Sequence, residues 1–242
     1  MSSQNMTKPL IMKKIFSLLS IVIVMTSCKG QEYGKERFDL SKLNFNMNAD
    51  NFYSEAMNKE NIKLSSGKQY VEKDTITEND LDWSGDRDKI FGVQFNVKGY
   101  SPKDTVAIFK NLNFSRLEAM TNETGSLMMV SATGKCTSEE FKKFLQTAIK
   151  EYKNPVVEDK EFSYFKNYHY TWILNDRIVQ LVSNTKIDFE QTPYNIISEK
   201  EKKAITEIEK DRLEEIHLFI CKTPFEKKLR GKLNSGNWSS FK

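Results

Sequence analysis

Two pairs of apolar segments, each joined by a few turn-forming residues, constrain the fold of this chain more than any other feature. Residues 168–174 and 177–183 flank Asn175-Asp176, a dipeptide suited to a tight two-residue hairpin. Residues 116–121 and 126–133 flank the turn sequence 122–125 in the same way. Strands joined by hairpins run antiparallel, because a parallel pair needs a long crossover connection. The chain is therefore predicted to build a mostly antiparallel or mixed sheet.

Further strands follow from alternation, and helices follow from capping sequences. Residues 91–97 alternate apolar and polar side chains, and residues 216–221 form a final apolar strand. Ser101-Pro102 predicts a helix bearing Val106, Phe109 and Leu112. Thr137 with Glu140 predicts a second helix that ends before Asn154-Pro155, and its apolar face is Phe141, Phe144, Leu145, Ala148 and Ile149.

Three weaker patterns complete the expected structure. Ser198 with Glu201 predicts a third, highly charged helix that runs to Leu213. Asp50 can cap a short helix, and residues 61–73 suggest a hairpin around Ser65-Ser66-Gly67. The sequence thus predicts the α+β class, in the order β-α-β-β-α-β-β-α-β, with about three helices packed on one face of the sheet.

The first 28 residues carry a three-part export pattern. Lys13 and Lys14 precede an eleven-residue apolar run, Ile15 to Met25, and the small Ser27 comes directly before Cys28. The run is too short to span a bilayer, which takes about 20 apolar residues in a helix. This order of charge, apolar run and small residue is that of a secretory signal peptide. With its cysteine at the cleavage point, the segment 12–28 resembles the signal peptide and lipobox of bacterial lipoproteins.

That resemblance implies that Cys28 becomes the first residue of the mature protein and carries lipid on its thiol. Two or three acyl chains give durable anchoring, since each buried methylene contributes about 0.8 kcal/mol. The alternatives are an ordinary signal peptide, or a short buried helix that contains a cysteine. Met12 lies next to the lysine pair and fits as the start better than Met1 or Met6. Lys29, where an Asp would indicate inner-membrane retention, favours the outer membrane and leaves its periplasmic or surface face open.

The distribution of charge divides the remaining chain. The net charge of the whole chain is +4, yet the leader has three lysines, and residues 222–242 have six basic residues against Glu226. We therefore expect a signal peptide at 1–27, a polar tether at 28–50, one α+β domain at 51–221 and a basic C-terminal tail at 222–242. A mildly acidic body argues against nucleic acid as a partner. The tail carries Phe225, Leu233, Trp238 and Phe241 among its basic residues, so it is expected either to lie on an anionic membrane or to remain a solvated terminus.

Two cysteines remain after Cys28. In an oxidising compartment Cys136 and Cys221 can form a disulfide, which would stabilise the fold by about 4 kcal/mol in the chain-entropy model. The alternative is two buried free thiols. Together with His169 and His217 they also form the chain's soft-ligand set for zinc, although the spacing matches no zinc signature and strand packing is favoured.

Residues 80–88 resemble the start of a calcium loop. Asp80, Asp82, Ser84, Asp86 and Asp88 place oxygens at positions 1, 3, 5, 7 and 9, with Gly85 at position 6. The twelfth position is Phe91, where the bidentate glutamate should be, so an acidic turn before a strand is favoured. Apart from this weak candidate, no metal is expected, and the lipid on Cys28 is the only expected prosthetic group.

Aromatic residues are dense between 162 and 172. They can form a binding surface for a sugar or a protein, or they can pack a sheet under its helices. Sheet packing is the favoured interpretation. The candidate binding surface consists of Tyr164, Phe165, Tyr168, Tyr170 and Trp172. No nucleophile elbow, phosphate loop or catalytic triad is recognisable. These observations favour a non-enzymatic envelope lipoprotein that binds a protein, as an immunity or inhibitor lipoprotein does, or an envelope component. An envelope hydrolase and a small-ligand or metal-binding module are the alternatives.

Overall fold

The computed structural model describes residues 31, 37–57, 70–98, 105–162, 165–187, 198, 200, 203, 213–233 and 236–242. The chain divides into two compact units, residues 1–32 and 33–242, and all that follows concerns the second. Cys28 and the leader lie outside the described residues. So do the hairpin turn expected at 65–67, the capping sequence at 101–104 and nearly all of the helix expected from Ser198. In the part that is described, no helix has the length and apolar character needed to cross a bilayer.

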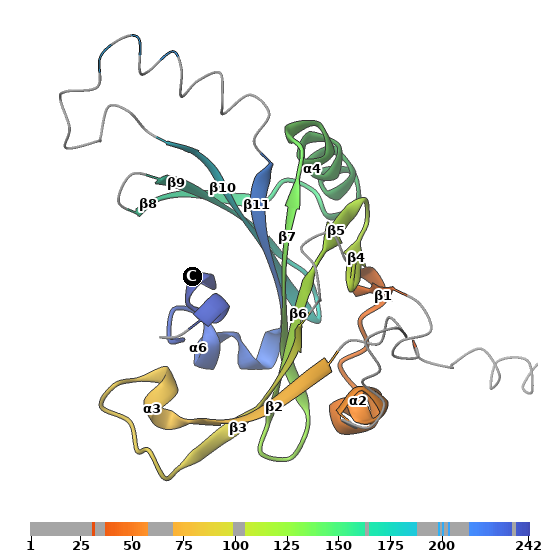
Figure 1. Ribbon diagram of the computed structural model, residues 1–242, viewed down its shortest axis with the longest axis vertical. Helices are drawn as coiled ribbons and strands as arrows, with labels where there is room; N and C mark the ends of the chain where they lie inside the picture. The colour runs from red at the N-terminus through yellow and green to blue at the C-terminus, as the bar shows by residue number, and fades with distance from the viewer. Residues whose placement is uncertain are drawn as a thin grey trace, which may run out of the picture. The chain divides into compact units, whose positions relative to one another are not determined.

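One curved, eight-stranded sheet organises the second unit (Figure 1). All neighbouring strands in it run antiparallel, as the hairpin sequences predict. From one edge to the other the strands are β2 (Tyr70–Thr77), β3 (Ile90–Lys98), β6 (Arg116–Asn122), β7 (Leu127–Cys136), β11 (Glu214–Lys222), β10 (Arg177–Ile187), β9 (Phe165–Ile173) and β8 (Val156–Phe162).

The two sequence-predicted hairpins are confirmed. Ile173 pairs with Ile178, and Leu174 donates its N–H to the carbonyl of Arg177, so Asn175-Asp176 forms the two-residue turn. In the β6–β7 hairpin the side chain of Asn122 accepts hydrogen bonds from the N–H groups of Thr124 and Ser126. The strands expected at 91–97 and 216–221 are also present, as β3 and β11. Strand β8 was not expected.

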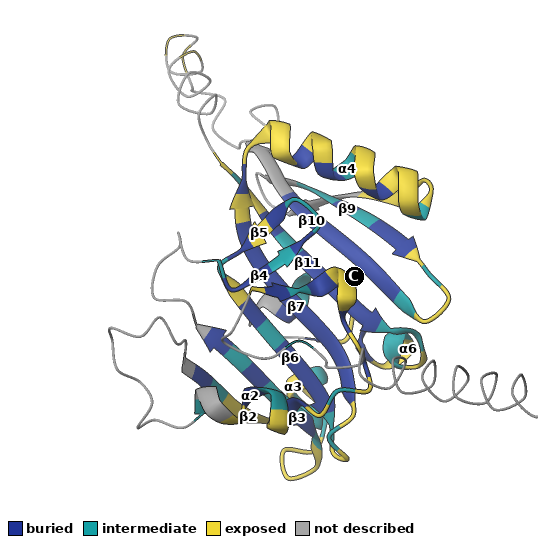
Figure 2. Ribbon diagram, turned by 90° about the vertical axis from the view of Figure 1, so that its right-hand side faces the viewer, coloured by how far each residue is buried: buried dark blue, intermediate teal, exposed yellow. Residues whose placement is uncertain are grey.

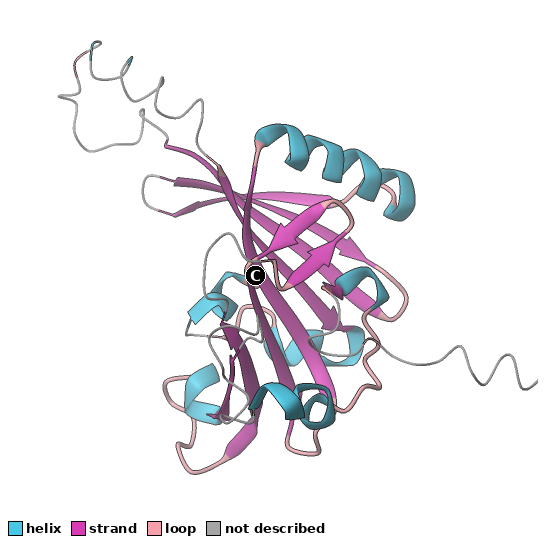
Figure 3. Cartoon of the chain, turned by 45° about the vertical axis from the view of Figure 1, so that its right-hand side comes forward, coloured by secondary structure: helices cyan, strands magenta, loops and turns pink. Residues whose placement is uncertain are grey.

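Both faces of the sheet are covered, and this corrects the expected helix layer on a single face. On one face lie α4 (Ser138–Tyr152), α2 (Ala49–Met57) and a small mixed sheet of β1 (Phe38–Asp39), β4 (Ala107–Phe109) and β5 (Leu112–Phe114). The concave face carries α6 (Glu226–Leu229) and the rest of the C-terminal segment, including η3 (Thr223–Phe225) and η4 (Gly236–Ser240). The described structure is mostly β, with few short helices (Figure 3).

Strand β11 shows why both faces need cover. Ile216, Leu218 and Ile220 belong to the core under α4 and the small sheet, whereas Phe219 and Cys221 belong to the core under the C-terminal segment. Successive side chains of a strand point to opposite faces. A strand that is apolar in both registers is therefore buried on both sides.

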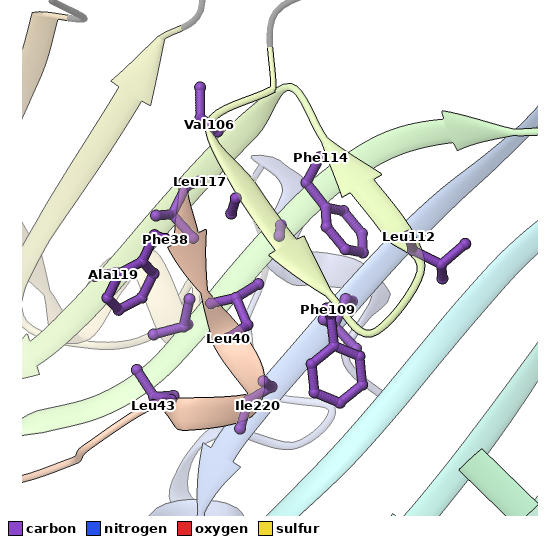
Figure 4. Close-up of a cluster of buried hydrophobic side chains, with 14 of the residues drawn as sticks. Phe38, Leu40, Leu43, Val106, Phe109, Leu112, Phe114, Leu117, Ala119 and Ile220 are labelled. Atoms are coloured by element: carbon purple, nitrogen blue, oxygen red, sulfur yellow. The ribbon is translucent and has the colours of Figure 1, made fainter. Parts of the chain in front are cut away.

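The second half of the predicted tether belongs in part to the core under α4 and the small sheet. Phe38, Leu40, Leu43 and Phe45 are all buried. Figure 4 shows Phe38, in strand β1 of the small sheet, and Leu40, which follows that strand, over Leu117, Ala119 and Ile220. Residues 38–45 thus belong to the folded body, because their apolar side chains recur on one side of the segment and fill the space beneath β4 and β5. The part of the predicted tether before Arg37, apart from Gln31, lies outside the described residues.

The prediction of a helix that carries Val106, Phe109 and Leu112 is wrong. These residues lie in and next to the β4–β5 hairpin, in which Phe109 pairs with Leu112 across Lys110, a residue with φ of 55°. Strand β5 packs closely on β7, where a Cβ added to Gly134 would lie 2.3 Å from the carbonyl oxygen of Asn113. The spacing of these apolar side chains fits both a helix and a strand. Pairing with neighbouring strands favours the strand conformation here.

Helix α4 confirms the second capping box. Thr137 Oγ1 accepts the N–H of Glu140 at 3.2 Å, and Glu140 Oε2 accepts the N–H of Thr137 at 2.8 Å. Phe141, Phe144 and Ala148 are buried against the sheet, while the opposite side of the helix is exposed (Figure 2). The helix ends at Tyr152, as the Asn154-Pro155 sequence indicates.

The basic C-terminal tail is folded, contrary to both expectations for it. Leu229, Leu233, Trp238 and Phe241 are buried on the concave face, and the ring of Phe241 lies 5.6 Å from that of Phe219. The buried side chain of Gln180 fixes the last residue: its Nε2 donates to the carbonyl of Lys242 at 2.7 Å, and its Oε1 accepts the N–H of Lys242 at 3.2 Å. The apolar side chains of the tail are thus used in a core.

Candidate ligand-binding pocket

An open pocket of about 670 Å³ lies on the concave side, where the C-terminal segment meets one end of the sheet. Its walls come from α3 (Glu78–Leu81), the start of β3, the β6–β7 turn and residues 225–232. We call it the α3–α6 pocket. The hairpin of β2 and β3 and the packing of the tail on the sheet position these four segments, which are far apart in sequence.

The floor of the pocket is apolar. Met128 is buried, while Leu81, Phe91 and Phe225 are partly buried and pack on the core of the concave face. Ile90, on the rim, is 48% exposed. Ligand sites in proteins are mostly apolar concavities with a small number of polar groups at the edge. The floor of this pocket has that character.

Positive charge is concentrated on the wall formed by the C-terminal segment. Lys227, Lys228 and Lys232 line the pocket, are exposed, and have no ion-pair partner among the described residues. Glu226, the acid of the same segment, is already bound 3.0 Å from Arg230 Nη1. The three lysine charges on this wall are therefore available to a ligand.

The other segments of the lining carry one lysine and the three acids of the pocket. Lys89 Nζ lies 2.6 Å from Glu78 Oε1, and this hydrogen bond raises the pKa of Lys89. Glu123 and Asp82 also line the pocket, so the lining as a whole carries four lysines and three acids. The pocket thus has a polarised charge pattern, with its free cations on one side.

The carboxylates of the calcium-loop sequence are engaged in local hydrogen bonds. Asp80 Oδ2 accepts the N–H of Thr77 at 2.7 Å, and Asp86 Oδ1 accepts the N–H of Asp88 at 2.8 Å. Asp82 Oδ1 accepts both the N–H and the hydroxyl of Ser84, and these bonds lower the pKa of Asp82. Within the described ranges no three His, Cys, Asp or Glu side chains gather as a metal site. The structure gives these oxygens the roles of a helix cap and of turns.

The two cysteines are both free and buried, so the structure has the second of the two possibilities and not the disulfide. They lie at opposite ends of the paired strands β7 and β11: Cys136 pairs with Glu214, and Cys221 pairs with Met129. Seven residues separate the two pairs, about 23 Å at the rise of an extended strand. Burial is the main cause that raises the pKa of each thiol to about 12. A thiol that stays protonated is a poor nucleophile and a poor metal ligand.

The two histidines are also strand residues outside the pocket. His169 is buried on β9, and His217 Nε2 on β11 lies 3.6 Å from Glu215 Oε1. Burial lowers the pKa of His217, Glu215 opposes this shift, and Arg116 adds to it. The structure does not bring the four candidate zinc ligands together.

The aromatic strand faces the sheet's own helix layer. Trp172 is buried, donates its indole N–H to the carbonyl of Lys153 at 3.0 Å, and packs edge-on against Phe144. Tyr170 packs against Phe141, and burial raises its pKa. Tyr168 is half-buried, the side chain of Phe165 and all of Tyr164 lie outside the description, and no aromatic binding surface follows from the rest. The reading of these residues as sheet packing is confirmed for Tyr170 and Trp172.

Sequence reasoning missed the pocket. Lys227 and Lys228 stood out only as part of a basic tail, and Phe91 only as a strand residue. The comparisons with known proteins add no assignment: no family model, no curated protein and no solved structure matches the chain.

Proposed function

We propose that the protein is a bacterial envelope lipoprotein, anchored by acyl chains on Cys28, whose folded domain binds an envelope component or a protein without catalysing a reaction. The observation that carries the binding function is the α3–α6 pocket, with its apolar floor and its wall of three unpaired lysines. The anchor is supported by the lysine pair, the apolar run and the cysteine of residues 12–28.

The chemistry of the described residues favours binding over catalysis. Both remaining thiols are buried with a raised pKa, and neither histidine lines the pocket. Of the three acids of the pocket, Asp82 is hydrogen-bonded by Ser84 and Glu78 is paired with Lys89. A general acid or base needs a pKa near the working pH and access to the substrate. The thiols meet neither requirement and the histidines do not reach the pocket, whereas exposed lysines and a half-covered apolar floor suit a ligand.

The anchor is tested by replacing the cysteine. In the Cys28→Ser variant we expect the protein to leave the membrane fraction, and the wild type to carry added mass at Cys28 that corresponds to acyl chains. Cys136→Ser is the matched control, because it removes a thiol from the folded body and should leave the membrane fraction unchanged. Membrane retention of Cys28→Ser, with no added mass in the wild type, would refute the anchor. Separation of inner and outer membranes tests the expected outer-membrane location.

The binding function is tested in intact cells. A photo-crosslinking residue in place of Ile90 lies on the rim of the pocket, and the same residue in place of Lys142 lies on the exposed side of α4. We expect a defined adduct from position 90 and none from position 142. Equal labelling at both positions, or turnover of a substrate by the purified protein, would contradict a binding domain that works through this pocket.

A further inference from the structure

We propose that the α3–α6 pocket binds a small amphiphile with a phosphate head group, its apolar chain on the floor and its head on the wall of Lys227, Lys228 and Lys232. This inference rests on the proposed function and specifies the chemical class of its ligand.

The size of the pocket points to a small molecule. Its volume of about 670 Å³ falls inside the range of about 300–1,000 Å³ that is typical of ligand pockets. A protein partner would instead contact a broad surface, of which this concavity would be one part. The pocket is open on one side, so a chain longer than the floor can extend into solvent.

The floor calls for an apolar group. Leu81, Phe91 and Phe225 pack with one side on the core of the concave face and line the pocket with the other. All three are partly exposed, and Ile90 extends the apolar surface to the rim. An aliphatic chain laid along these side chains would remove their surface from water, which is the main driving force for apolar association.

The lysine wall calls for an anion with more than one charge. Three of the four lysines that line the pocket come from residues 227–232, and Glu226, the acid of that segment, is bound to Arg230. The acids of the lining belong to the other segments, and Lys232, after the hydrogen bonds from Ser84, contributes to lowering the pKa of Asp82. A phosphate monoester carries about −1.5 to −2 charges at neutral pH and offers three acceptor oxygens. A carboxylate offers two oxygens and one charge, so it can contact fewer of the three lysines at once. Across the pocket Lys89 is paired with Glu78, and Asp82 and Glu123 are acids, so the head group of an anion is directed to the lysine wall.

The alternative to a small ligand in the pocket is a membrane surface that the lysines bind. One exposed residue distinguishes these two possibilities. Trp83 is 78% exposed and lies in the segment next to the pocket, but it does not line it. Docking on a bilayer would bury Trp83 together with the lysines, because tryptophan favours the membrane interface. A ligand inside the pocket would leave Trp83 in water.

The experiment uses the full chain and dodecyl phosphate as monomeric probe, with binding followed by calorimetry. Dodecyl maltoside, which has a neutral head, and inorganic phosphate, which has no chain, are the comparison ligands. The pocket variant is Lys227→Ser/Lys228→Ser/Lys232→Ser. Its matched control, Lys142→Ser/Lys143→Ser/Lys150→Ser, removes the same charge from exposed positions on α4.

We expect the pocket variant to bind dodecyl phosphate about tenfold more weakly than the control variant, as three exposed ion pairs predict. Ile90→Ser should weaken binding of the same probe several-fold, and Trp83→Ser should leave it unchanged. Dodecyl maltoside and inorganic phosphate should each bind more weakly than dodecyl phosphate. Raising the salt concentration should weaken the binding of dodecyl phosphate in the wild type, which gives a second measurement that needs no variant.

Equal binding of dodecyl phosphate by the two triple variants would overturn the inference. Binding to vesicles with anionic lipid that depends on Trp83, without pocket-dependent binding of the monomeric probe, would assign the surface to a membrane and also overturn it. A specific protein adduct from position 90 in cells, together with no binding of dodecyl phosphate, would refute this ligand class and leave the proposed binding function in place.

Discussion

Replacing Phe241 by alanine should destabilise the protein by about 3–5 kcal/mol, the usual cost for a buried phenylalanine. Phe241 is fully buried, and its ring lies 5.6 Å from that of Phe219 on the central strand β11. An aromatic side chain buries about 150–250 Å², which at about 25 cal/mol per Å² corresponds to about 4–6 kcal/mol as an upper bound. The range from alanine substitutions and the estimate from buried area agree. The loss would be a large part of the stability of a domain, which is about 5–15 kcal/mol.

Urea unfolding followed by circular dichroism measures this loss as a shift of the midpoint at constant slope. Ile173→Ala is the control, because Ile173 is 66% exposed and its truncation should change the free energy of unfolding by less than about 0.5 kcal/mol. A loss below about 1 kcal/mol for Phe241→Ala would show that the C-terminal segment does not pack on the concave face. The α3–α6 pocket would then lose one of its walls, so this result bears on the binding function as well.

Two further predictions concern the sheet. Burial holds the pKa of the Cys136 and Cys221 thiols at about 12, against 9.0 for an exposed thiol, so above pH 9.0 the unfolded chain binds fewer protons than the fold. The free energy of unfolding should therefore fall by about 2 kcal/mol per thiol between about pH 9 and about pH 11. The Cys136→Ala/Cys221→Ala variant should lack this part of the decrease. An identical pH dependence of the free energy of unfolding in both proteins would refute this prediction. Gly134→Ala should lower the free energy of unfolding in urea by at least about 2 kcal/mol, because the added methyl group would meet the carbonyl of Asn113. Lys135→Ala, at an exposed position, should lower it by less than about 0.5 kcal/mol. Equal losses for the two variants would show that β5 does not pack closely on β7 at Gly134.

The sequence was informative where a local signal and the tertiary structure agree. The turns at 122–125 and 175–176 place four of the eight strands, and the capping box at Thr137 places α4, because each signal depends on residues that are close in the chain. It misled where one apolar spacing fits two structures. Val106, Phe109 and Leu112 share a helical face, but they also fit a short hairpin, and only the neighbouring sheet decides between them.

Strand β8 was missed for a related reason. Its residues 156–162 include Glu158, Asp159, Lys160 and Glu161, which are unusual in a strand. Edge strands carry such charges because their outer hydrogen-bonding groups are unpaired and could otherwise join another chain. β8 is the edge of the sheet, so its charged composition reflects its position and hides its structure from a propensity argument.

The pocket was not predicted, because the tail was expected to be a solvated terminus or to lie on a membrane. The strand that precedes the tail carries a signal for its folded position. Residues 216–221 are apolar in both registers of a strand, apart from His217, so two layers must cover β11. The helix of residues 138–152 and the small sheet can cover one face only. Trp238 and Phe241 follow within the same chain and supply the apolar surface that the other face requires. Once the tail is placed there, Lys227, Lys228 and Lys232 come to the start of β3, and the basic segment becomes a wall of the α3–α6 pocket.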